Sequence, residues 1–391
     1  HHWHWHLIYP AEGEHRDRRG ELFFYMHQQI VARCDIERLA NGLNRVKPLH
    51  NWNEPIPEAY FPKLTVENSG IVWGSRPAGM RMQDIDIKDE SIDLKFKIND
   101  LERWRSRIYH AIHQGVLEDP SGKKIRIDGD NDEGIDLLGN VIEAAPKLSI
   151  NPKLYGDMHN LGHAAIAFIH DPDRSHRENA GVMYQAMGDM RDPLFYRWHK
   201  FVDDMAQEHK ATLTPYTIKP TEEQKKTKFA LTYDEIELES VKVITQDGHK
   251  SESNVLITGW QESDLTLNRG LDFTAKFPVI ARVKHMQHLP FTYTIKVNNK
   301  SRVPQDIVLR IFMAPTYDEI GKELDLRDQR HFMVEMDKYN VKVQPGVTKL
   351  ERKSSDSAVT IPFELTFREL ESAYTTSTPQ FNFCGCGWPH I

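Results

Sequence analysis

Two pairs of histidines, each four residues apart, are the feature that most constrains the fold of this chain. They are His2 with His6 and His159 with His163, the only pairs with this spacing among twenty histidines. Residues four apart lie on one face of an α-helix, where two imidazoles can bind one metal ion. At this histidine frequency roughly one such pair arises by chance, so the spacing alone does not establish a metal site.

Each pair is followed by a lone histidine on another predicted helix. His27 follows the first pair and His199 follows the second, and aromatic residues flank both in the sequence. Two sets of three histidines on four helices predict a helical bundle whose core holds two metal ions. Spacing alone leaves the alternative open, in which these histidines serve the core or the surface without a metal.

The residue types around the histidines favour copper. All-imidazole ligation suits copper, zinc or iron, and neither set has a nearby cysteine or a carboxylate at ligand spacing. A zinc hydrolase usually adds a glutamate directly after the first histidine, as in a His-Glu-x-x-His motif. Trp3 and Asn160 occupy those positions here. The twenty histidines, about twice the ordinary share, agree with a metal protein.

Hydrophobic spacing predicts that residues 1–214 form a helical domain. Apolar residues recur at helical intervals, and a proline-rich stretch around residues 48–62 marks a long connection. Asp192-Pro193 is typical of a helix start, because proline is tolerated at the first helical position. The predicted helices cover residues 20–43, 100–114, 135–144, 155–169 and 193–210.

Beyond residue 215 the pattern alternates. Apolar residues at 291, 293, 295 and 297 are separated by polar ones. Residues 307–313 form a run that is apolar apart from Arg310 and is interpreted as a strand buried on both faces. Several such strands predict an antiparallel sandwich or barrel. Residues 219–228 are interpreted as a linker or a long loop. The chain is therefore predicted to be an α+β multidomain protein, with a helical dicopper domain at 1–214 and a β domain at 215–391.

Composition and the chain ends narrow the class of protein. The formal net charge of −7 argues against nucleic-acid binding, which needs a concentrated basic face. No apolar run approaches the ~18 residues of a membrane span. Without an initiator methionine or a signal segment, we expect an internal piece of a longer chain. We expect Cys34 to be buried and inert, and the partners of Cys384 and Cys386, if these are oxidised, to lie beyond Ile391.

Long segments of the sequence resemble the arthropod hemocyanin and prophenoloxidase family, in the family's order. They are HHWHWHLIYP (1–10), DRRGELFFYMHQQ (17–29), DMHNLGHAAIAFIHDPD (157–173), MRDPLFYRWHKFVDD (190–204) and FNFCGCGWP (381–389). The resemblance implies a helical copper domain followed by a seven-stranded, immunoglobulin-like domain, with the family's N-terminal helical domain absent from this chain. It further implies a copper A site formed by His2, His6 and His27 and a copper B site formed by His159, His163 and His199.

The resemblance implies an oxygen-binding pair of copper ions with one of two uses. In a phenoloxidase, dioxygen at the copper pair hydroxylates monophenols and oxidises o-diphenols to o-quinones. In a hemocyanin, a shielded site carries oxygen. We expect a type 3 copper phenoloxidase, most like that of a crustacean or insect, from GCGWP (385–389), the residues around His27, and Asn160. Hemocyanin oxygen transport is the alternative, and a hexamerin-like storage protein would have lost copper ligands.

Asn160 and Glu178 are the candidate catalytic residues. Related tyrosinases use an asparagine at the position of Asn160 to help activate a water that deprotonates the phenol. Glu178, in the loop between the copper B helices, is a candidate base. Asp203 is a candidate for orienting the imidazole of His199. YQAMGDMRDP (184–193) differs from the small, threonine-rich run usual in the family, so no substrate pocket is inferred from this loop.

The resemblance also implies a biological setting. Two copper ions and dioxygen would serve small phenols in melanin formation and innate immunity, in a protein secreted into the hemolymph. The protein would be a homo- or hetero-oligomer, either a dimer or a hexamer, activated by a serine protease if it is a zymogen, without nucleic-acid or membrane partners. The Gly-Cys-Gly segment is interpreted as part of a structural disulfide, and Asn299 begins an N-glycosylation triplet.

Overall fold

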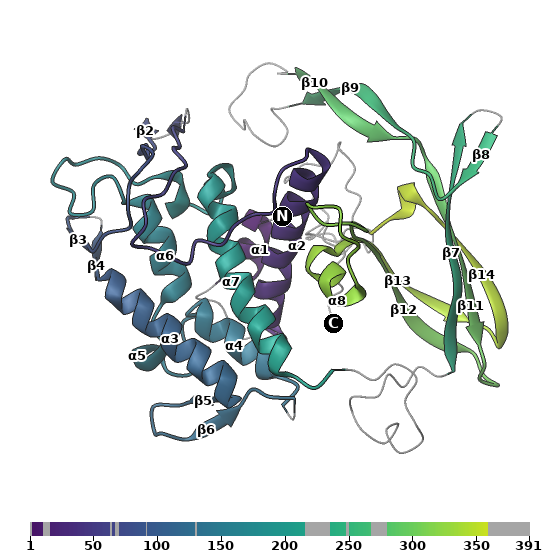
Figure 1. Ribbon diagram of the computed structural model, residues 1–391, viewed down its shortest axis with the longest axis horizontal. Coiled ribbons are helices and arrows are strands. Elements are labelled where there is room, and N and C mark those ends of the chain that lie inside the picture. Colours follow the sequence, from purple (N-terminus) through teal and green to yellow (C-terminus); the bar gives the residue numbers. More distant parts are fainter. Residues whose placement is uncertain are drawn as a thin grey trace, which may run out of the picture. The chain divides into compact units, whose positions relative to one another are not determined.

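The computed structural model describes residues 2–10, 16–62, 65–66, 70–90, 92–129, 131–215, 235–247, 250–266 and 280–358. The chain forms two compact units (Figure 1). His2–Thr214 and Ala314–Val334 make the helical unit, and the β unit is built mainly from Pro215–Met313 and Glu335–Ile391. The domain boundary near residue 215 stays a prediction, and the predicted linker, Cys384 and Cys386 lie outside the described residues.

The helical unit contains the helices that the spacing predicts at 20–43, 100–114, 135–144 and 193–210, with ends that shift by a few residues. None of the helices in the described ranges combines the length and the apolar character needed to cross a membrane. The α-helices are α1 (His2–Ile8), α2 (Arg19–Ala40), α3 (Ile98–Gln114), α4 (Gly134–Ile142), α5 (Pro152–Tyr155), α6 (Met158–Ala167), α7 (Pro193–Thr212) and α8 (Leu326–Gln329).

Short elements complete this unit. Among the described residues of this unit, three 3-10 turns stand beside the helices, and three two-stranded antiparallel hairpins lie between α2 and α4 in the sequence. The turns are η1 (Val182–Tyr184), η2 (Asp189–Arg191) and η5 (Arg330–Phe332), and the hairpins are β1 (Thr65–Val66) with β2 (Ile71–Val72), β3 (Ile85–Lys88) with β4 (Asp93–Phe96), and β5 (Val116–Glu118) with β6 (Lys124–Arg126).

The single helix predicted at 155–169 is two helices. Gly156 adopts φ 71° and ψ −158°, which ends α5 and re-aims the chain. Asp157 then caps α6, because its side chain accepts a hydrogen bond from the backbone N–H of Asn160. The break matters because it sets the direction of the helix that carries His159 and His163.

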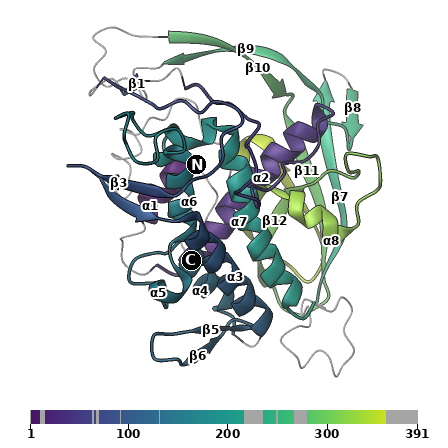
Figure 2. The ribbon, with the colours of Figure 1, turned by 60° about the vertical axis from the view of Figure 1, so that its left-hand side comes forward.

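Glycines let the helices approach closely at two crossings. A Cβ on Gly20 would lie 2.0 Å from the carbonyl oxygen of Asp136, so α2 and α4 pack backbone against backbone. A Cβ on Gly162 would lie 1.9 Å from Cζ2 of Trp198, which joins α6 to α7. Figure 2 shows α2, α6 and α7 gathered in the same unit. The second crossing joins two histidine-bearing helices, since α6 carries His159 and His163 and α7 carries His199.

Residues 314–334 return to the helical unit. The amide Nε2 of Gln28 donates to the backbone oxygen of His331 at 3.2 Å, and Nε2 of Gln29 donates to that of Met333 at 2.8 Å. Both glutamines lie on α2, directly after His27. This late segment of the chain therefore supports the helix that carries His27.

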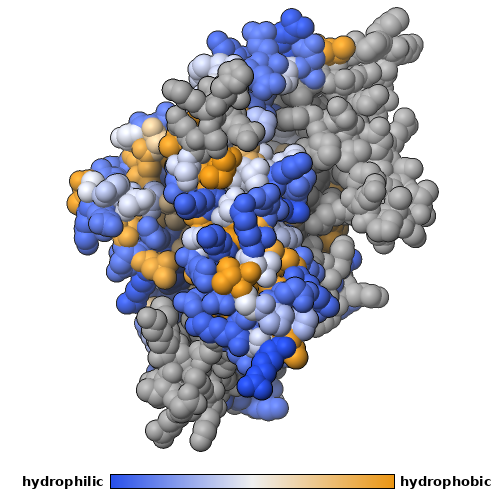
Figure 3. Space-filling view, turned by 90° about the vertical axis from the view of Figure 1, so that its right-hand side faces the viewer, coloured by the Kyte–Doolittle hydropathy of each residue, from blue (hydrophilic) through white to orange (hydrophobic). Residues whose placement is uncertain are grey.

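Antiparallel strands form the β unit. A four-stranded sheet has the order β14-β11-β7-β8, and β12 pairs with β13 and β9 with β10. Viewed from the side on which β7 and β14 are drawn, the described surface is mostly hydrophilic, with separate hydrophobic patches (Figure 3). The strands are β7 (Ile236–Asp247), β8 (Lys250–Ser253), β9 (Thr258–Thr266), β10 (Ile280–His288), β11 (Phe291–Asn299), β12 (Gln305–Met313), β13 (Val334–Val343) and β14 (Gly346–Lys353).

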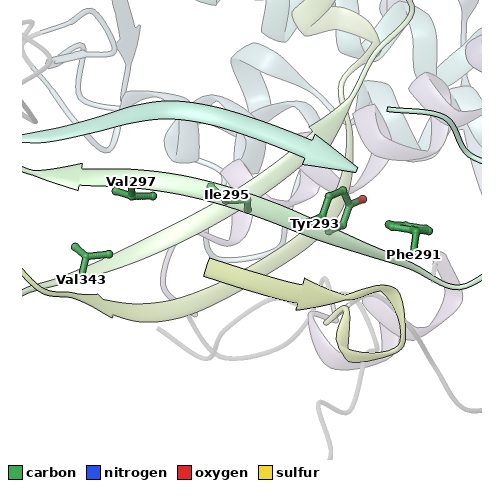
Figure 4. Close-up of a cluster of buried hydrophobic side chains, with 5 residues drawn as sticks. All are labelled: Phe291, Tyr293, Ile295, Val297 and Val343. Carbon is green, nitrogen blue, oxygen red and sulfur yellow. The ribbon is translucent and has the colours of Figure 1, made fainter. Parts of the chain in front are cut away.

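The β core lies along β11. The alternation predicted there is confirmed, since its apolar residues are buried together with Val343 (Figure 4). The expectation that 307–313 is buried on both faces is wrong. Along β12 partly buried residues alternate with exposed ones, and Val308 is 57% exposed. Its partner in the sheet is β13, and one face of β12 meets solvent.

The structure places two further side chains noted in the sequence. Cys34 is a free thiol that is only partly buried, so the expectation of full burial is wrong, although burial raises the pKa of its thiol. Asn299 is 1% exposed, and its amide donates hydrogen bonds to the backbone oxygens of Val303 and Val343. An amide in this position has no room for a glycan.

Candidate metal centre

Six histidines from four helices meet in the core of the helical unit. His2 and His6 come from α1, His27 from α2, His159 and His163 from α6, and His199 from α7. Their Nε2 atoms face one another. The Nε2 atoms of His2 and His6 are 3.1 Å apart, and Nε2 of His199 lies 3.2 Å from that of His159 and 3.4 Å from that of His163.

His27 stands between the two predicted sets. Candidate ligand nitrogens of His2, His6 and His27 lie within 4.8 Å of one another, and so do those of His27, His159 and His199. The rings of His27 and His199 stack with centroids 4.2 Å apart and an interplanar angle of 3°. His163 joins the cluster through His199. The structure thus brings all six side chains into one cluster, and their division into two sets of three remains a prediction.

The helical backbone orients two of the imidazoles. Nδ1 of His27 donates to the carbonyl oxygen of Phe23 and Nδ1 of His199 donates to that of Phe195, both at 2.8 Å and both four residues earlier in the same helix. Because a carbonyl can only accept, Nδ1 carries the proton and Nε2 keeps its lone pair. Nε2 is therefore the atom available to a metal ion.

Three more imidazole rings are held at Nδ1, two by backbone carbonyls of a loop and one by a neighbouring side chain. His2 and His163 donate through Nδ1 to the carbonyl oxygens of Ala186 and Met183, at 3.0 and 2.9 Å. Nδ1 of His159 lies 3.0 Å from Oδ1 of Asn160. The loop at 183–186 thus holds one ring from each predicted set, and such bonds fix both the tautomer and the ring orientation.

Burial favours the neutral form of three of these imidazoles, those of His6, His27 and His199. It lowers the pKa of His6 to about 2, with the neighbouring His2 adding to the effect. For His27 and His199, burial first and neighbouring histidines second place the pKa well below the ordinary value. Nε2 of His27 is buried and has no hydrogen-bond partner among the described residues. A buried lone pair of this kind calls for a positive partner, so the donor set fits a metal ion that accepts imidazole, such as copper.

Aromatic rings enclose the cluster. Phe195 packs against His2 and His199 with centroids 4.8 and 4.1 Å apart, and Phe23 packs against His27 and His159 at 4.5 and 4.9 Å. Both phenylalanines are fully buried. Rings in these positions keep water away from the Nε2 atoms and strengthen electrostatic interactions inside the cluster.

The two candidate catalytic residues, Asn160 and Glu178, lie in different surroundings. Asn160 lies beside the cluster, where Oδ1 meets His159 and Nδ2 donates to the carbonyl oxygen of Glu143 at 2.7 Å. Glu178 is 58% exposed, with Oε2 3.7 Å from Nε2 of His170. In the described part of the chain, no hydrogen bond or ion pair connects Glu178 with the six histidines. Its role as a base stays a prediction.

Asp203 does not fill its candidate role of orienting His199. Nδ1 of His199 already donates to its own helix, and the carboxylate of Asp203 accepts a hydrogen bond from Nε2 of Gln207 at 3.0 Å. Lys200 lies 3.5 Å from the same carboxylate. The side chain of Asp203, four positions after His199, therefore contacts Gln207 and Lys200 and not the imidazole.

One charged residue of the site, Asp189, is not predicted from the sequence. Asp189 is 2% exposed, and its Oδ1 lies 3.2 Å from Nδ1 of His2 while its Oδ2 lies 3.8 Å from Nδ1 of His163. The available signal was the unusual segment at 184–193, which contains this aspartate. Because this segment differs from the run usual in the family, the sequence supports no inference about the residues that it places at the site.

Comparisons with known proteins agree with this architecture. Residues 1–206 match the family described as "Hemocyanin, copper containing domain" and residues 225–391 match "Hemocyanin, ig-like domain". Over the whole chain, Phenoloxidase 2 of Drosophila melanogaster is 47% identical and Phenoloxidase 1 of Holotrichia diomphalia is 44% identical. The chain spans 56% and 55% of the length of these two relatives.

Two solved structures share the fold across the chain. A hemolymph type prophenoloxidase from a crustacean gives a TM-score of 0.81 at 34% identity, covering 99% of this chain and 56% of that one. A scorpion hemocyanin in its activated state gives 0.81 at 40% identity, covering 100% of this chain and 59% of that one. With its helical copper domain followed by an immunoglobulin-like domain, the chain belongs to the hemocyanin family.

Proposed function

We propose that this chain carries the catalytic centre of a phenoloxidase, an enzyme that acts on small phenols with dioxygen. His2, His6 and His27 would hold one copper ion, and His159, His163 and His199 would hold the second. The observation that carries the proposal is the convergence of six imidazoles whose Nε2 atoms face one another. The similarity over the whole chain to phenoloxidases supports it.

When bound, the two copper ions would supply the binding and reduction of dioxygen for ortho-hydroxylation of monophenols and oxidation of o-diphenols to o-quinones. The protein's own contribution is orientation and exclusion of water. Hydrogen bonds at Nδ1 hold five of the rings in place, and Phe23 and Phe195 shield the cluster. Rings fixed before the metal binds need little reorganisation, which favours catalysis.

Asn160 and Glu178 have separate roles in this proposal. Asn160 would keep the Nδ1 proton of His159 in place through Oδ1 and would help activate a water. Glu178 would accept the phenolic proton. The variant Glu178→Gln tests this second role, because it preserves size and removes the base. We expect monophenol turnover to fall by about 10²-fold or more, with copper content unchanged.

Hemocyanin-type oxygen transport is the second candidate. The scorpion hemocyanin is 40% identical at the same TM-score as the prophenoloxidase, and His2, His27, His159 and His199 are each at most 3% exposed. A covered centre suits a carrier, because a phenol must reach the metal pair to react.

Copper loading followed by oxygen and a diphenol separates the candidates. The protein is loaded with copper, exposed to oxygen, and assayed for quinone formation before and after limited proteolysis. A near-ultraviolet band that depends on oxygen, together with diphenol turnover, is the expected result. The band without turnover in either condition would favour the carrier. A protein that takes up copper without giving the band would contradict both candidates, and His27→Ala and His199→Ala serve as matched controls that should lose it.

The setting follows from the same similarity. We propose secretion into the hemolymph, where the protein would act in melanin formation and innate immunity as a homo- or hetero-oligomer, either a dimer or a hexamer. If it is a zymogen, a serine protease would activate it. Sedimentation of the full-length protein measures the oligomeric state, and turnover before and after protease treatment measures latency.

A further inference from the structure

The carboxylate of Asp189 lies between one histidine of each predicted set. It reaches His2 through Oδ1 and His163 through Oδ2, at 3.2 and 3.8 Å from the respective Nδ1 atoms. Asp189 opens the turn η2, just before Asp192 caps helix α7. The two histidines come from α1 and α6, so a single side chain touches both halves of the cluster.

This carboxylate lacks the partners that ordinarily compensate a buried charge. Asp189 is 2% exposed, and its Oδ1 accepts no hydrogen bond from the described residues. The Nδ1 protons of His2 and His163 already point to the carbonyl oxygens of Ala186 and Met183. A buried carboxylate without a cation or a full set of donors is costly. The two ring systems beside it are the ones that would carry positive metal ions.

Its neighbour Asp192 shows the contrast. Asp192 is also buried, but it is paired with the guanidinium of Arg76 at 2.5 and 2.6 Å and accepts a hydrogen bond from the backbone N–H of Leu194. Asp192 therefore has a full structural explanation. For Asp189, three residues earlier, the ion-pair contacts within the described part of the chain are with the imidazoles of His2 and His163.

We infer that Asp189 is a positioning residue shared by the two metal sites, whose negative charge strengthens metal binding through His2 at one site and His163 at the other. The inference rests on the proposed function, since it assumes that the six histidines hold two copper ions. A carboxylate on the Nδ1 side of a ligating imidazole raises the basicity of the ligand and fixes the ring. Here one carboxylate would do so for both metals.

The test is the affinity of the full chain for Cu(I), measured without oxygen by competition with a chelator and normalised to the folded fraction. Asp189→Asn keeps the shape of the side chain and removes its charge. We expect overall affinity to fall by about 10- to 100-fold. The matched control is Asp35→Asn, at another buried aspartate, which lies two turns after His27 on α2. The carboxylate of Asp35 accepts a hydrogen bond from the backbone N–H of Val46. This control variant should leave the affinity unchanged.

Single-site backgrounds resolve the two contributions. His159→Ala leaves the first set of ligands complete, and His6→Ala leaves the second set complete. Because the carboxylate is closer to His2 than to His163, Asp189→Asn should weaken binding more in the His159→Ala background. An unchanged affinity in both backgrounds, with two copper ions bound by the unmodified chain, would overturn the inference alone. Fewer than two copper ions in the unmodified chain would overturn the proposed function as well.

The melting temperature separates positioning from a structural role. Removing an uncompensated buried charge should leave the melting temperature of the metal-free protein unchanged or higher, while the increase produced by copper becomes smaller. If Asp189 only braces the loop, both the metal-free and the copper-loaded forms will melt earlier by the same amount, and that result would overturn the inference. Asp189→Ser provides a second neutral variant if Asp189→Asn folds poorly.

Discussion

Replacing Gly162 by alanine tests the packing that brings His159 and His163 to His199. The added Cβ would lie 1.9 Å from Cζ2 and 2.3 Å from Cη2 of Trp198. Carbon atoms make contact at about 3.5 Å, so the closer pair is roughly 1.6 Å short of a normal separation. Trp198 is fully buried, and the rings of Trp52 and Phe201 are centred 5.9 and 5.2 Å from it, which leaves the indole little room to move.

The packing argument predicts that Gly162→Ala lowers stability, the opposite of its usual effect in a helix. In an open helix, glycine to alanine stabilises by up to about 1 kcal/mol. Here overpacking should reverse that gain, and we expect Gly162→Ala to destabilise the helical unit by about 1–3 kcal/mol. For a unit of this size the melting temperature should fall by about 2–4 °C for each kcal/mol. Calorimetry on metal-free protein measures the change.

A second substitution shows whether the indole is the cause. Trp198→Phe removes the outer part of the indole, at a cost of about 1–2 kcal/mol if scaled from the ~3–5 kcal/mol of a full truncation to alanine. In that background Gly162→Ala should cost less than in the unmodified chain, with a coupling energy of about 0.5–3 kcal/mol. Stabilisation by Gly162→Ala, or strict additivity of the two substitutions, would refute the packing argument.

Three further predictions concern other parts of the chain. Asn160→Ala removes the acceptor beside Nδ1 of His159 and should weaken copper binding at the second site by about 10-fold in chelator competition, whereas Asn160→Asp should not; an equal loss at both sites would argue against this local role. Burial lowers the pKa of His331 to about 4, so below pH ~6.5 the unfolded chain takes up a proton that the folded chain does not. Stability should therefore decline as the pH falls from 6.5 towards 4, and His331→Gln should reduce this slope in melting experiments; an unchanged slope would contradict the assignment. Asn299 should carry no glycan in mass spectra of the protein expressed through a secretory pathway, and a glycan at Asn299 would contradict its burial. Asn299→Ala should destabilise the protein by about 1–3 kcal/mol, because two buried carbonyl oxygens lose their donor.

Spacing in the sequence predicts which side chains share a helical face. The four-residue interval places His2 with His6 and His159 with His163, and the structure brings both pairs to one cluster. It also predicts the alternation along β11. These are local properties, because side-chain direction follows directly from helical or strand geometry.

Contacts that depend on the path of the chain could not be predicted in this way. The anchoring of His2 and His163 by the carbonyls of Ala186 and Met183 requires a loop to fold back over two helices. The position of Asp189 depends on the same loop. The position of Asp203 in the helix left open whether it contacts His199, and the ring has a backbone acceptor instead. For the loop carbonyls and for Asp189, tertiary structure chooses among partners that the sequence leaves equally available, whereas the acceptor of His199 is local.

The return of Ala314–Val334 to the helical unit has a consequence for synthesis on the ribosome. Roughly 100 residues are translated between the end of the first segment and the start of the second. At about 5–20 residues per second, this interval lasts on the order of 5–20 s. Throughout it, Gln28 and Gln29 lack the backbone acceptors that His331 and Met333 later supply. The emerging chain therefore passes through a stage in which its first helices are present but unfinished, and that stage is when chaperones or misfolding compete for it.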